Sequence, residues 1–490
     1  MKPVFVLRLV LFVTMLGIAT QAYAAELIDG QLWLEVFLDS GTQIAMKSRD
    51  ARTPVFTITE IGSPISKQVE GNLKLSFMNW DKLPFWGLLN RVEPLTAASD
   101  DGDFATRQSF TWIDGKLALK KEKLIFEPDS FNTQATAQRY AEELGIPRSQ
   151  VQAIPMLNAT VKVLAGNNEH YFETPLRIKS DRDIQIGGLN LAFGGEFIIK
   201  AIGEKLVITH FLTLENYVGG VIQNEIGSSA PLEALKTQAI AARTHAVSLL
   251  LYNRHQGDGY DLCNSTHCQV YKGQHLSNAN IITAVQATEH EVLISNGRIA
   301  DATYHSACGG KTDSSANIWK GAPISHLMGV TCIEAADSLD LSTESGARLW
   351  LDSKLNDPEA SNWEKSSLQW KRDISRTRLA SNLGLTKLSK IEIIKRGHSG
   401  RILQMRFTGS KTVTLDSEYK IRQAFGGLPS SFFFIASSGS TIVVKGKGAG
   451  HGVGMCQIGV LRLARSGWSY PDILSMYYPG TLISKDWMPQ

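Results

Sequence analysis

The stretch Leu214–Ser248, LENYVGGVIQNEIGSSAPLEALKTQAIAARTHAVS, decides how this chain is interpreted. Its second half predicts a helix over 228–251, because apolar residues recur there at spacings of three and four. Pro231 suits the first turn of that helix, where its missing N–H costs nothing. The residues of the apolar stripe are Leu232, Leu235, Ala239, Ala242, Ala246 and Leu249. Since the alanines allow close packing, we expect this helix to be central to its domain.

Glu225 directly precedes the predicted helix and lies between Ile222 and Ile226. Partial burial beside these apolar residues would favour the protonated carboxyl group, which a general acid requires at neutral pH. Such a group can protonate a glycosidic oxygen. The alternative is a glutamate whose charge only stabilises the helix N-terminus.

The preceding residues, 27–202, predict strands joined by turns. Leu32–Leu38 and Leu73–Phe77 alternate or run apolar, and Gly, Asp and Asn lie between such segments. One helix is expected over 133–144. No catalytic constellation occurs in this part of the chain, so a β-rich accessory domain over 25–204 is expected. Further along, 391–407 and 412–415 predict strands, and 458–465 predicts a short helix.

The first residues have the three parts of a secretory signal peptide. Lys2 and Arg8 precede the apolar run Leu9–Ile18, and Ala22-Tyr23-Ala24 provides a cleavage site before Ala25. The alternative is an uncleaved anchor, although the run is short for crossing a hydrocarbon core. No later segment resembles a membrane span. We therefore expect residues 1–24 to be removed and the protein to be periplasmic or secreted, without a transmembrane anchor.

The composition excludes several classes of protein. Of the 490 residues 43% are hydrophobic and 20% are charged, which excludes intrinsic disorder and collagen-like repeats. The 50 Lys and Arg residues nearly balance the 47 Asp and Glu residues, so nucleic acid is not an expected partner. Five cysteines are too few for a scaffold built on disulfides. A metalloprotease has little support, because no H-E-x-x-H motif occurs.

Cys263, His267 and Cys268 form a C-x3-H-C cluster that fits two structural roles. Two thiolates and an imidazole can hold zinc, with His255 as the fourth ligand. In an oxidising compartment, Cys263 and Cys268 can instead form a disulfide. Elsewhere, Cys308 is expected to pair with Cys332, which leaves Cys456 over.

The motifs resemble those of the SpoIID/LytB (stage II sporulation protein D) family. After the opening stretch, the resemblance continues in four more blocks that occur in the family's order and bring its span to about residues 205–485. They are HCQVYKGQ at His267–Gln274, YHSACGGKT at Tyr304–Thr312, GKGAGHGVGMCQIG at Gly446–Gly459 and GWSYPDILSMYYPGT at Gly467–Thr481. Several separate motifs in register make the match specific.

The resemblance implies an α+β fold in which a SpoIID-like catalytic domain over 205–485 follows the β-rich N-terminal domain. It also implies a peptidoglycan lytic transglycosylase that cuts between N-acetylmuramic acid and N-acetylglucosamine and leaves a 1,6-anhydro end, preferably on strands stripped of peptides by an amidase. The family's catalytic glutamate falls on Glu225. No cofactor is required for this chemistry. The family also includes modifiers that bind glycan and stimulate a cell-wall amidase without cutting, and this is the second hypothesis.

The chain departs from the family pattern near Glu225. The family's Met-Pro is Ile226-Gly227 here, its Ala-Arg-Thr-Tyr is Ala242-Arg243-Thr244-His245, and its Gly-Met-Ser-Gln is Gly454-Met455-Cys456-Gln457. Since Glu225 is retained, activity is expected, whereas the rate and the glycan preference are open.

Further residues are candidates for substrate binding. Arg243 can bind a lactyl carboxylate or pair with a structural acid such as Glu215. A glycine-rich turn can bring His451 and Gln457 to the cleft, and His451 can equally be structural. The residues Tyr304, His305 and Ser306 can donate hydrogen bonds to sugar groups or serve the structure. Tyr477 and Tyr478 can stack on sugars or pack in the core.

Overall fold

The computed structural model describes residues 25–50, 52–61, 65–80, 85–90, 105–113, 116–125, 139, 151–156, 159–189, 191–252, 254–255, 258–273, 278–355 and 359–488. The signal peptide expected over 1–24 lies outside these residues, and so does the helix expected over 133–144 apart from Arg139. Among the described residues, no helix combines the length and the apolar character needed to cross a bilayer.

The chain divides into two compact units. Unit 1 comprises Met1–Glu225, Ala246–Ile282 and Lys485–Gln490, and unit 2 comprises Ile226–His245 and Thr283–Ser484. This division differs from the boundary expected between residues 204 and 205. That boundary falls in the turn between two hydrogen-bonded strands, β14 (Ala192–Ile202) and β15 (Lys205–Thr213), so the second of them stays with the N-terminal sheet.

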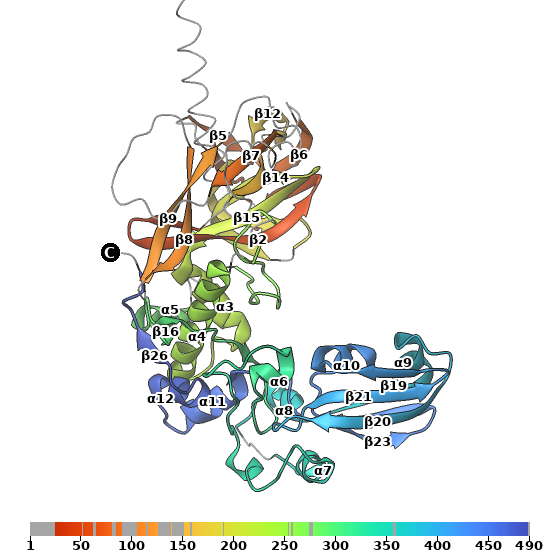
Figure 1. Cartoon of the computed structure of the whole chain (residues 1–490). Helices are drawn as coiled ribbons and strands as arrows, with labels where there is room; N and C mark the ends of the chain where they lie inside the picture. The colour runs from red at the N-terminus through yellow and green to blue at the C-terminus, as the bar shows by residue number, and fades with distance from the viewer. Residues whose placement is uncertain are drawn as a thin grey trace, which may run out of the picture. The chain divides into compact units, whose positions relative to one another are not determined.

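Unit 1 is built on an 11-stranded antiparallel sheet with the order β1-β2-β15-β14-β13-β3-β6-β11-β12, to which β4 and β5 are added beside β13. Figure 1 shows β2, β15 and β14 in this sheet. Its strands are β1 Glu26–Ile28, β2 Gln31–Gly41, β3 Gln43–Ser48, β4 Val55–Glu60, β5 Ser66–Glu70, β6 Leu73–Trp80, β11 Ala159–Ala165, β12 Asn168–Glu173, β13 Leu176–Ile186, β14 Ala192–Ile202 and β15 Lys205–Thr213.

The period of two in the sequence explains these strands. In β11, Ala159, Val161, Val163 and Ala165 are buried, and the residues between them are partly exposed. A second sheet has the order β10-β7-β9-β8. Its strands are β7 Phe85–Asn90, β8 Ala105–Ile113, β9 Lys116–Ile125 and β10 Val151–Met156. The predicted β-rich N-terminal region and the mixed α+β class are therefore confirmed.

Two helices follow the large sheet. Helix α3 (Leu214–Glu225) packs against β15 and β2, and α4 (Leu232–Leu251) begins directly after Pro231, four residues later than the predicted start at residue 228. The expected single apolar stripe on α4 is wrong in two respects. Leu232 is 40% exposed, whereas Arg243 and the polar residues Thr237, Gln238 and Thr244 are buried with the alanines. The helix is thus buried on nearly all sides along most of its length, and small residues make this possible.

Unit 2 contains several small sheets. One has the order β20-β21-β22, another β19-β24-β23, a third β17-β16-β26, and β18 pairs with β25. Helix α9 packs against β19 and β20, and α10 packs against β21 (Figure 1). The strands predicted over 391–407 and 412–415 and the helix over 458–465 are confirmed as β20, β21, β22 and α11.

The strands of unit 2 are β16 Val292–Ser295, β17 Arg298–Ile299, β18 Tyr304–His305, β19 Trp370–Ser375, β20 Leu388–Arg396, β21 Ile402–Gly409, β22 Thr412–Leu415, β23 Phe433–Ser438, β24 Thr441–Gly446, β25 Met455–Cys456 and β26 Leu482–Ser484. The remaining helices, of which α5 begins in unit 1, are α5 Ala279–Ala287, α6 Ser315–Trp319, the 3-10 helix η2 Glu334–Ala336, α7 Glu344–Asp352, α8 Asn362–Leu368, α9 Arg376–Asn382, α10 Glu418–Ala424, α11 Gln457–Arg465 and α12 Tyr470–Tyr477.

Candidate functional site

Glu225 is the last residue of α3, and its carboxylate is half-buried. The backbone N–H of Val270 donates a hydrogen bond of 3.0 Å to its Oε1. Glu225 therefore ends one helix seven residues before α4 begins, and Glu233 is the acidic residue in the first turn of α4.

The contact between α3 and the segment Tyr271–Gly273 holds Val270 beside Glu225. Gly220 of α3 has no room for a side chain, because a Cβ atom there would lie 2.4 Å from the carbonyl oxygen of Gly273 and 2.4 Å from the ring of Tyr271. Tyr217, one turn earlier, stacks on Tyr271 with ring centroids 5.3 Å apart. This close approach sets the position of the amide that contacts the carboxylate.

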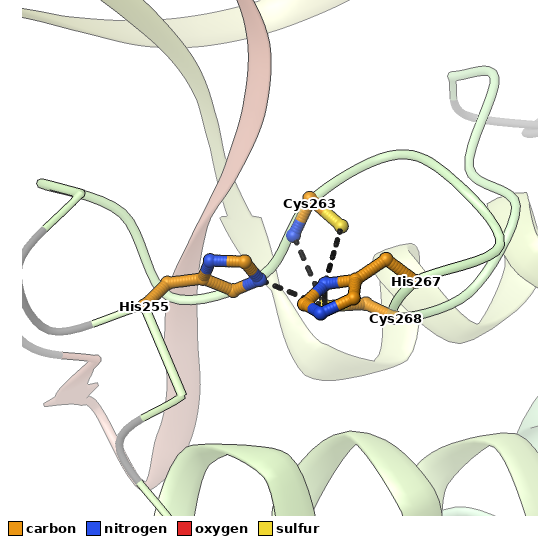
Figure 2. A group of neighbouring side chains, drawn as sticks. All are labelled: His255, Cys263, His267 and Cys268. Carbon is orange, nitrogen blue, oxygen red and sulfur yellow. Dashed lines mark hydrogen bonds between the residues drawn. The ribbon is translucent and has the colours of Figure 1, made fainter.

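The predicted Cys/His cluster of unit 1 comes together, and we call it cluster 1: His255, Cys263, His267 and Cys268 (Figure 2). Its four ligand atoms all lie within 4.8 Å of one another. The Nε2 atom of His255 is 3.2 Å from Cys268 Sγ, and Cys263 Sγ is 3.6 Å from His267 Nδ1. Both cysteines are free thiols here, so the structure does not contain the alternative disulfide.

The surroundings of cluster 1 fit zinc. The Nδ1 atom of His255 bonds Asp258 Oδ2 at 2.8 Å, which turns Nε2 toward the sulfurs in the way a carboxylate orients a zinc-binding histidine. Hydrogen bonds from the side chains of Cys268, Ser265 and His267 lower the pKa of Cys263 to about 3, although burial opposes this effect, whereas the hydrogen bond to Cys263 and burial raise the pKa of Cys268. Two thiolates and two imidazoles are a common donor set of structural zinc.

Cluster 1 is joined to the large sheet and to Glu225. Just before Cys263, Leu262 bridges to Val36 of β2 and its carbonyl accepts the N–H of Phe37 at 2.8 Å. Val270, whose amide contacts Glu225, follows Cys268 by two residues. Cluster 1 therefore fixes the N-terminal end of the segment in which the amide of Val270 contacts Glu225.

In unit 2, two of the family-like blocks assemble into one structure. Strand β18, with Tyr304 and His305, pairs in parallel with β25, with Met455 and Cys456. Isolated bridges join Ala307 to Ala449 and Asp313 to Val453. The blocks Tyr304–Thr312 and Gly446–Gly459 thus lie side by side, although more than a hundred residues separate them in sequence.

His451 is held by the backbone at both ring nitrogens. Its Nε2 donates to the carbonyl of Tyr304 at 3.0 Å, and its Nδ1 accepts the N–H of Val453 at 3.1 Å. Burial and the nearby charges of His305 and Arg401 hold the pKa of His451 well below its usual value. A neutral imidazole with a fixed tautomer therefore lies in the glycine-rich turn.

Trp319, which the sequence did not single out, lies against His451 with ring centroids 5.3 Å apart. Its side chain is 46% exposed, so it offers a face on which a sugar ring can stack. A solitary tryptophan in a polar segment carries no pattern from which this position could have been inferred.

Three other candidates for substrate binding have buried side chains. Arg243 donates from Nη1 to the carbonyl of Glu291 at 2.9 Å, and Gln457 donates from Nε2 to Gln238 Oε1 at 3.4 Å. His305 is 4% exposed. Contact of these three residues with a substrate stays a prediction, and burial favours structural roles.

Tyr304 and Ser306 are partly exposed, and their carbonyls serve the fold. The carbonyl of Ser306 accepts the N–H of Ile458 at 3.0 Å, as that of Tyr304 accepts His451. Tyr477 and Tyr478 are buried, and Tyr478 donates to the carbonyl of Thr303 at 2.8 Å. Tyr477 and Tyr478 therefore pack in the core and are not placed to stack on a sugar.

The remaining cysteines also gather. The sulfurs of Cys308, Cys332 and Cys456 lie within 4.8 Å of one another, and all three are free thiols. The expected pairing of Cys308 with Cys332, with Cys456 left over, is therefore wrong for this structure: the third sulfur belongs to the same group. Burial raises the pKa of Cys456, but hydrogen bonds with the side chains of Cys308 and Cys332 lower it, and this pKa lies well below its usual value.

Comparisons with known proteins match two parts of the chain. Residues 203–294 match the SpoIID family, described as stage II sporulation protein. Residues 313–454 match a family described as a domain of unknown function (DUF8618).

Individual relatives extend the similarity. An uncharacterized protein of Brachyspira hyodysenteriae is 32% identical over 291 residues, which are 59% of this chain and 72% of that protein. The stage II sporulation protein D of Bacillus subtilis is 28% identical over 294 residues, 56% of this chain and 75% of the relative. The amidase enhancer of Bacillus subtilis is 29% identical over 300 residues, 54% of this chain but only 40% of that longer protein.

Proposed function

Because the chain belongs to the SpoIID family, whose members act at the cell wall, we propose that it is a peptidoglycan lytic transglycosylase with Glu225 as its catalytic residue. The substrate is the bond between N-acetylmuramic acid and N-acetylglucosamine, on strands from which an amidase has removed the peptides. This activity places the protein in the periplasm or outside the cell, in agreement with the signal peptide expected over residues 1–24.

One carboxyl group suffices for this reaction. Glu225 donates its proton to the glycosidic oxygen, and the bond from that oxygen to C1 breaks. The resulting carboxylate takes the proton of the sugar's own C6 hydroxyl, whose oxygen bonds to C1 and closes the 1,6-anhydro ring. No water is consumed, so the second carboxylate of a hydrolytic glycosidase is dispensable.

The observation that carries the proposal is the pairing of Glu225 with the amide of Val270 at the end of α3. A helix C-terminus disfavours a negative charge, which supports the acid in its first step. The N–H of Val270 donates to Oε1 and supports the carboxylate that acts as base in the second. The helix C-terminus thus favours the protonated form of Glu225 in the first step, and the N–H of Val270 favours its carboxylate in the second.

We propose further that cluster 1 holds a structural zinc ion. His255, Cys263, His267 and Cys268 would supply the four ligands, and the ion would stiffen the segment that presents Val270 to Glu225. The zinc takes no part in bond cleavage, so its role would be positional.

The test is incubation of the full chain with amidase-treated glycan strands, followed by mass analysis of the products. We expect 1,6-anhydro ends from the wild-type protein and none from Glu225→Gln, with equal thermal melting of the two proteins. Glu233→Gln is the matched control, since it removes another helix-associated carboxylate. Hydrolysed ends without the anhydro ring, or equal products from Glu225→Gln, would contradict the proposal.

A second candidate function rests on the similarity to the amidase enhancer. Under this hypothesis the chain binds glycan and stimulates a cell-wall amidase. In the same assay, intact strands together with faster release of peptides by an added amidase would favour this function over transglycosylation.

A further inference from the structure

The thiols of Cys308, Cys332 and Cys456 come from three separate parts of unit 2. Cys308 follows β18, Cys332 follows the bridge between Lys311 and Thr331, and Cys456 ends β25 and caps α11. Their sulfurs lie within 4.8 Å of one another. Sulfurs that share a tetrahedral zinc ion lie about 3.8 Å apart, from Zn–S bonds of about 2.3 Å, so small side-chain rotations would reach that geometry.

Hydrogen-bonding groups lie against each of these sulfurs. The N–H of Gly310 donates to Cys308 Sγ at 3.3 Å, and the N–H groups of Cys308 and Gly459 donate to Cys456 Sγ at 3.2 and 3.3 Å. Cys332 Sγ forms a hydrogen bond of 2.9 Å with the hydroxyl of Tyr477. Donors aimed at several clustered sulfurs suit thiolates, but buried anions that repel one another need a cation between them.

The candidate for a fourth ligand is His305, which lies beside Cys456. In the register of β18 with β25 it lies directly opposite Cys456. Its Nδ1 bonds the carbonyl of Val453 at 3.1 Å, so this nitrogen carries the proton and Nε2 keeps its lone pair. Within the described part of the chain, Nε2 is buried and has no hydrogen-bond partner. A histidine that donates one N–H to a carbonyl and turns the other nitrogen inward has the usual orientation of a zinc ligand.

We propose that His305, Cys308, Cys332 and Cys456, which we call cluster 2, bind a second zinc ion as a Cys3His structural site. The ion would fasten Cys332 and its neighbours to the paired strands β18 and β25, and so hold the two family-like blocks of unit 2 together. Gly459 lets Cys332 and Tyr477 approach α11 closely, because a Cβ atom at this position would lie 2.4 Å from Cys332 Sγ and 1.9 Å from Tyr477 Oη.

The experiment counts zinc per chain in full-length protein purified without chelators. Cys263→Ser/Cys268→Ser removes cluster 1 and is expected to retain one zinc ion. Adding Cys308→Ser, Cys332→Ser and Cys456→Ser should remove that ion. His305→Ala should weaken zinc binding in competition with a chelating dye by more than the about 10–100-fold typical of losing an outer-shell partner. His305→Cys should retain zinc, since four thiolates also form a structural site.

Two outcomes would overturn the proposal. The first is zinc that remains when the three cysteines of cluster 2 are replaced. The second is a disulfide between any two of them in the freshly purified protein, found by mass spectrometry after alkylation under denaturing conditions, with no zinc bound to the Cys263→Ser/Cys268→Ser protein. Should the multiple variant fail to fold, cobalt exchange into the Cys263→Ser/Cys268→Ser protein gives an independent readout: thiolate-to-cobalt absorption is expected, and its absence would count against the site.

Discussion

Cluster 1 and cluster 2 use similar ligands but connect the chain in different ways. Cluster 1 closes a local loop, in which all four residues fall between His255 and Cys268 and the neighbouring segment presents an amide to Glu225. Cluster 2 joins the sulfurs of Cys308, Cys332 and Cys456 with His305, which pairs with Cys456 in the register of β18 and β25. Cluster 1 can therefore position the amide beside Glu225, whereas cluster 2 can hold segments together that are distant in sequence. Loss of cluster 1 should therefore affect activity first, and loss of cluster 2 should affect stability first.

The largest effect is expected from Cys263→Ser/Cys268→Ser. Without the sulfurs of cluster 1 the amide of Val270 is no longer fixed beside Glu225, and misplacement by about 1 Å costs about 10²-fold in rate. The measurement is the yield of anhydro ends per unit time, with hydrogen exchange at residues 263–272 as the structural readout. Thr266→Ser, at an exposed position of the same loop, is the control. Unchanged activity with zinc absent from cluster 1 would separate cluster 1 from the site of Glu225.

Asp258→Ala should lower the affinity of cluster 1 for zinc by about 10–100-fold, because Asp258 orients the imidazole of His255. Asp258→Asn keeps an oxygen that can accept the same hydrogen bond and should have a smaller effect. Both affinities can be measured by competition with a chelating dye. Equal losses in the two variants would show that the charge of Asp258, rather than its hydrogen bond, is what matters.

Two glycine substitutions probe the two regions in parallel. Gly220→Ala places a methyl group against Tyr271 and Gly273, and Gly459→Ala places one against Tyr477 and Cys332. Overpacking of this kind costs about 1–3 kcal/mol of unfolding free energy. We expect the first variant also to lose glycan cleavage and the second to lose zinc from cluster 2. Denaturant unfolding, cleavage and zinc content measured on both variants would test the comparison, and an exchange of the two outcomes would refute it.

A further prediction concerns pH and unit 1. Burial, together with the charge of Glu35, raises the pKa of Asp261 to about 7. The folded protein therefore binds more protons at this residue than the unfolded chain between pH about 4 and about 7, so stability should fall as the pH rises through this range, by at most about 1.4 kcal/mol per pH unit. Asp261→Asn should flatten this slope in urea unfolding measured from pH 4 to 8. A slope that persists in the variant would assign it to other groups.

The two regions also differ in what the sequence could predict. The spacing of Cys263, His267 and Cys268, with His255 nearby, was enough to predict cluster 1, because residues close in sequence share one loop. Cluster 2 was missed, since no spacing rule relates Cys332 to Cys456 and counting cysteines favours a pair with one left over. The register of β18 with β25 and the bridge between Lys311 and Thr331 bring the residues of cluster 2 together.

The same reasoning applies to the fold. Alternation predicted the strands of unit 1, and the periodicity of three and four predicted α4. What periodicity could not show is that polar residues such as Gln238 and Thr244 are buried along that helix, because their partners lie in distant segments. Glu225 was predicted from its motif, but its place at the end of α3 depends on the packing of Gly220 against Gly273.

The bridge between Asp313 and Val453 has a consequence for how unit 2 can change over evolution. The residues between them, which match a domain family of their own, leave the paired strands and return to the same place. The segment between Asp313 and Val453 can therefore change in length or be replaced by another segment, while its two ends keep their positions. Cys332 lies in this segment and belongs to cluster 2. A replacement segment without a cysteine at the same place would therefore leave the zinc ion with one ligand fewer.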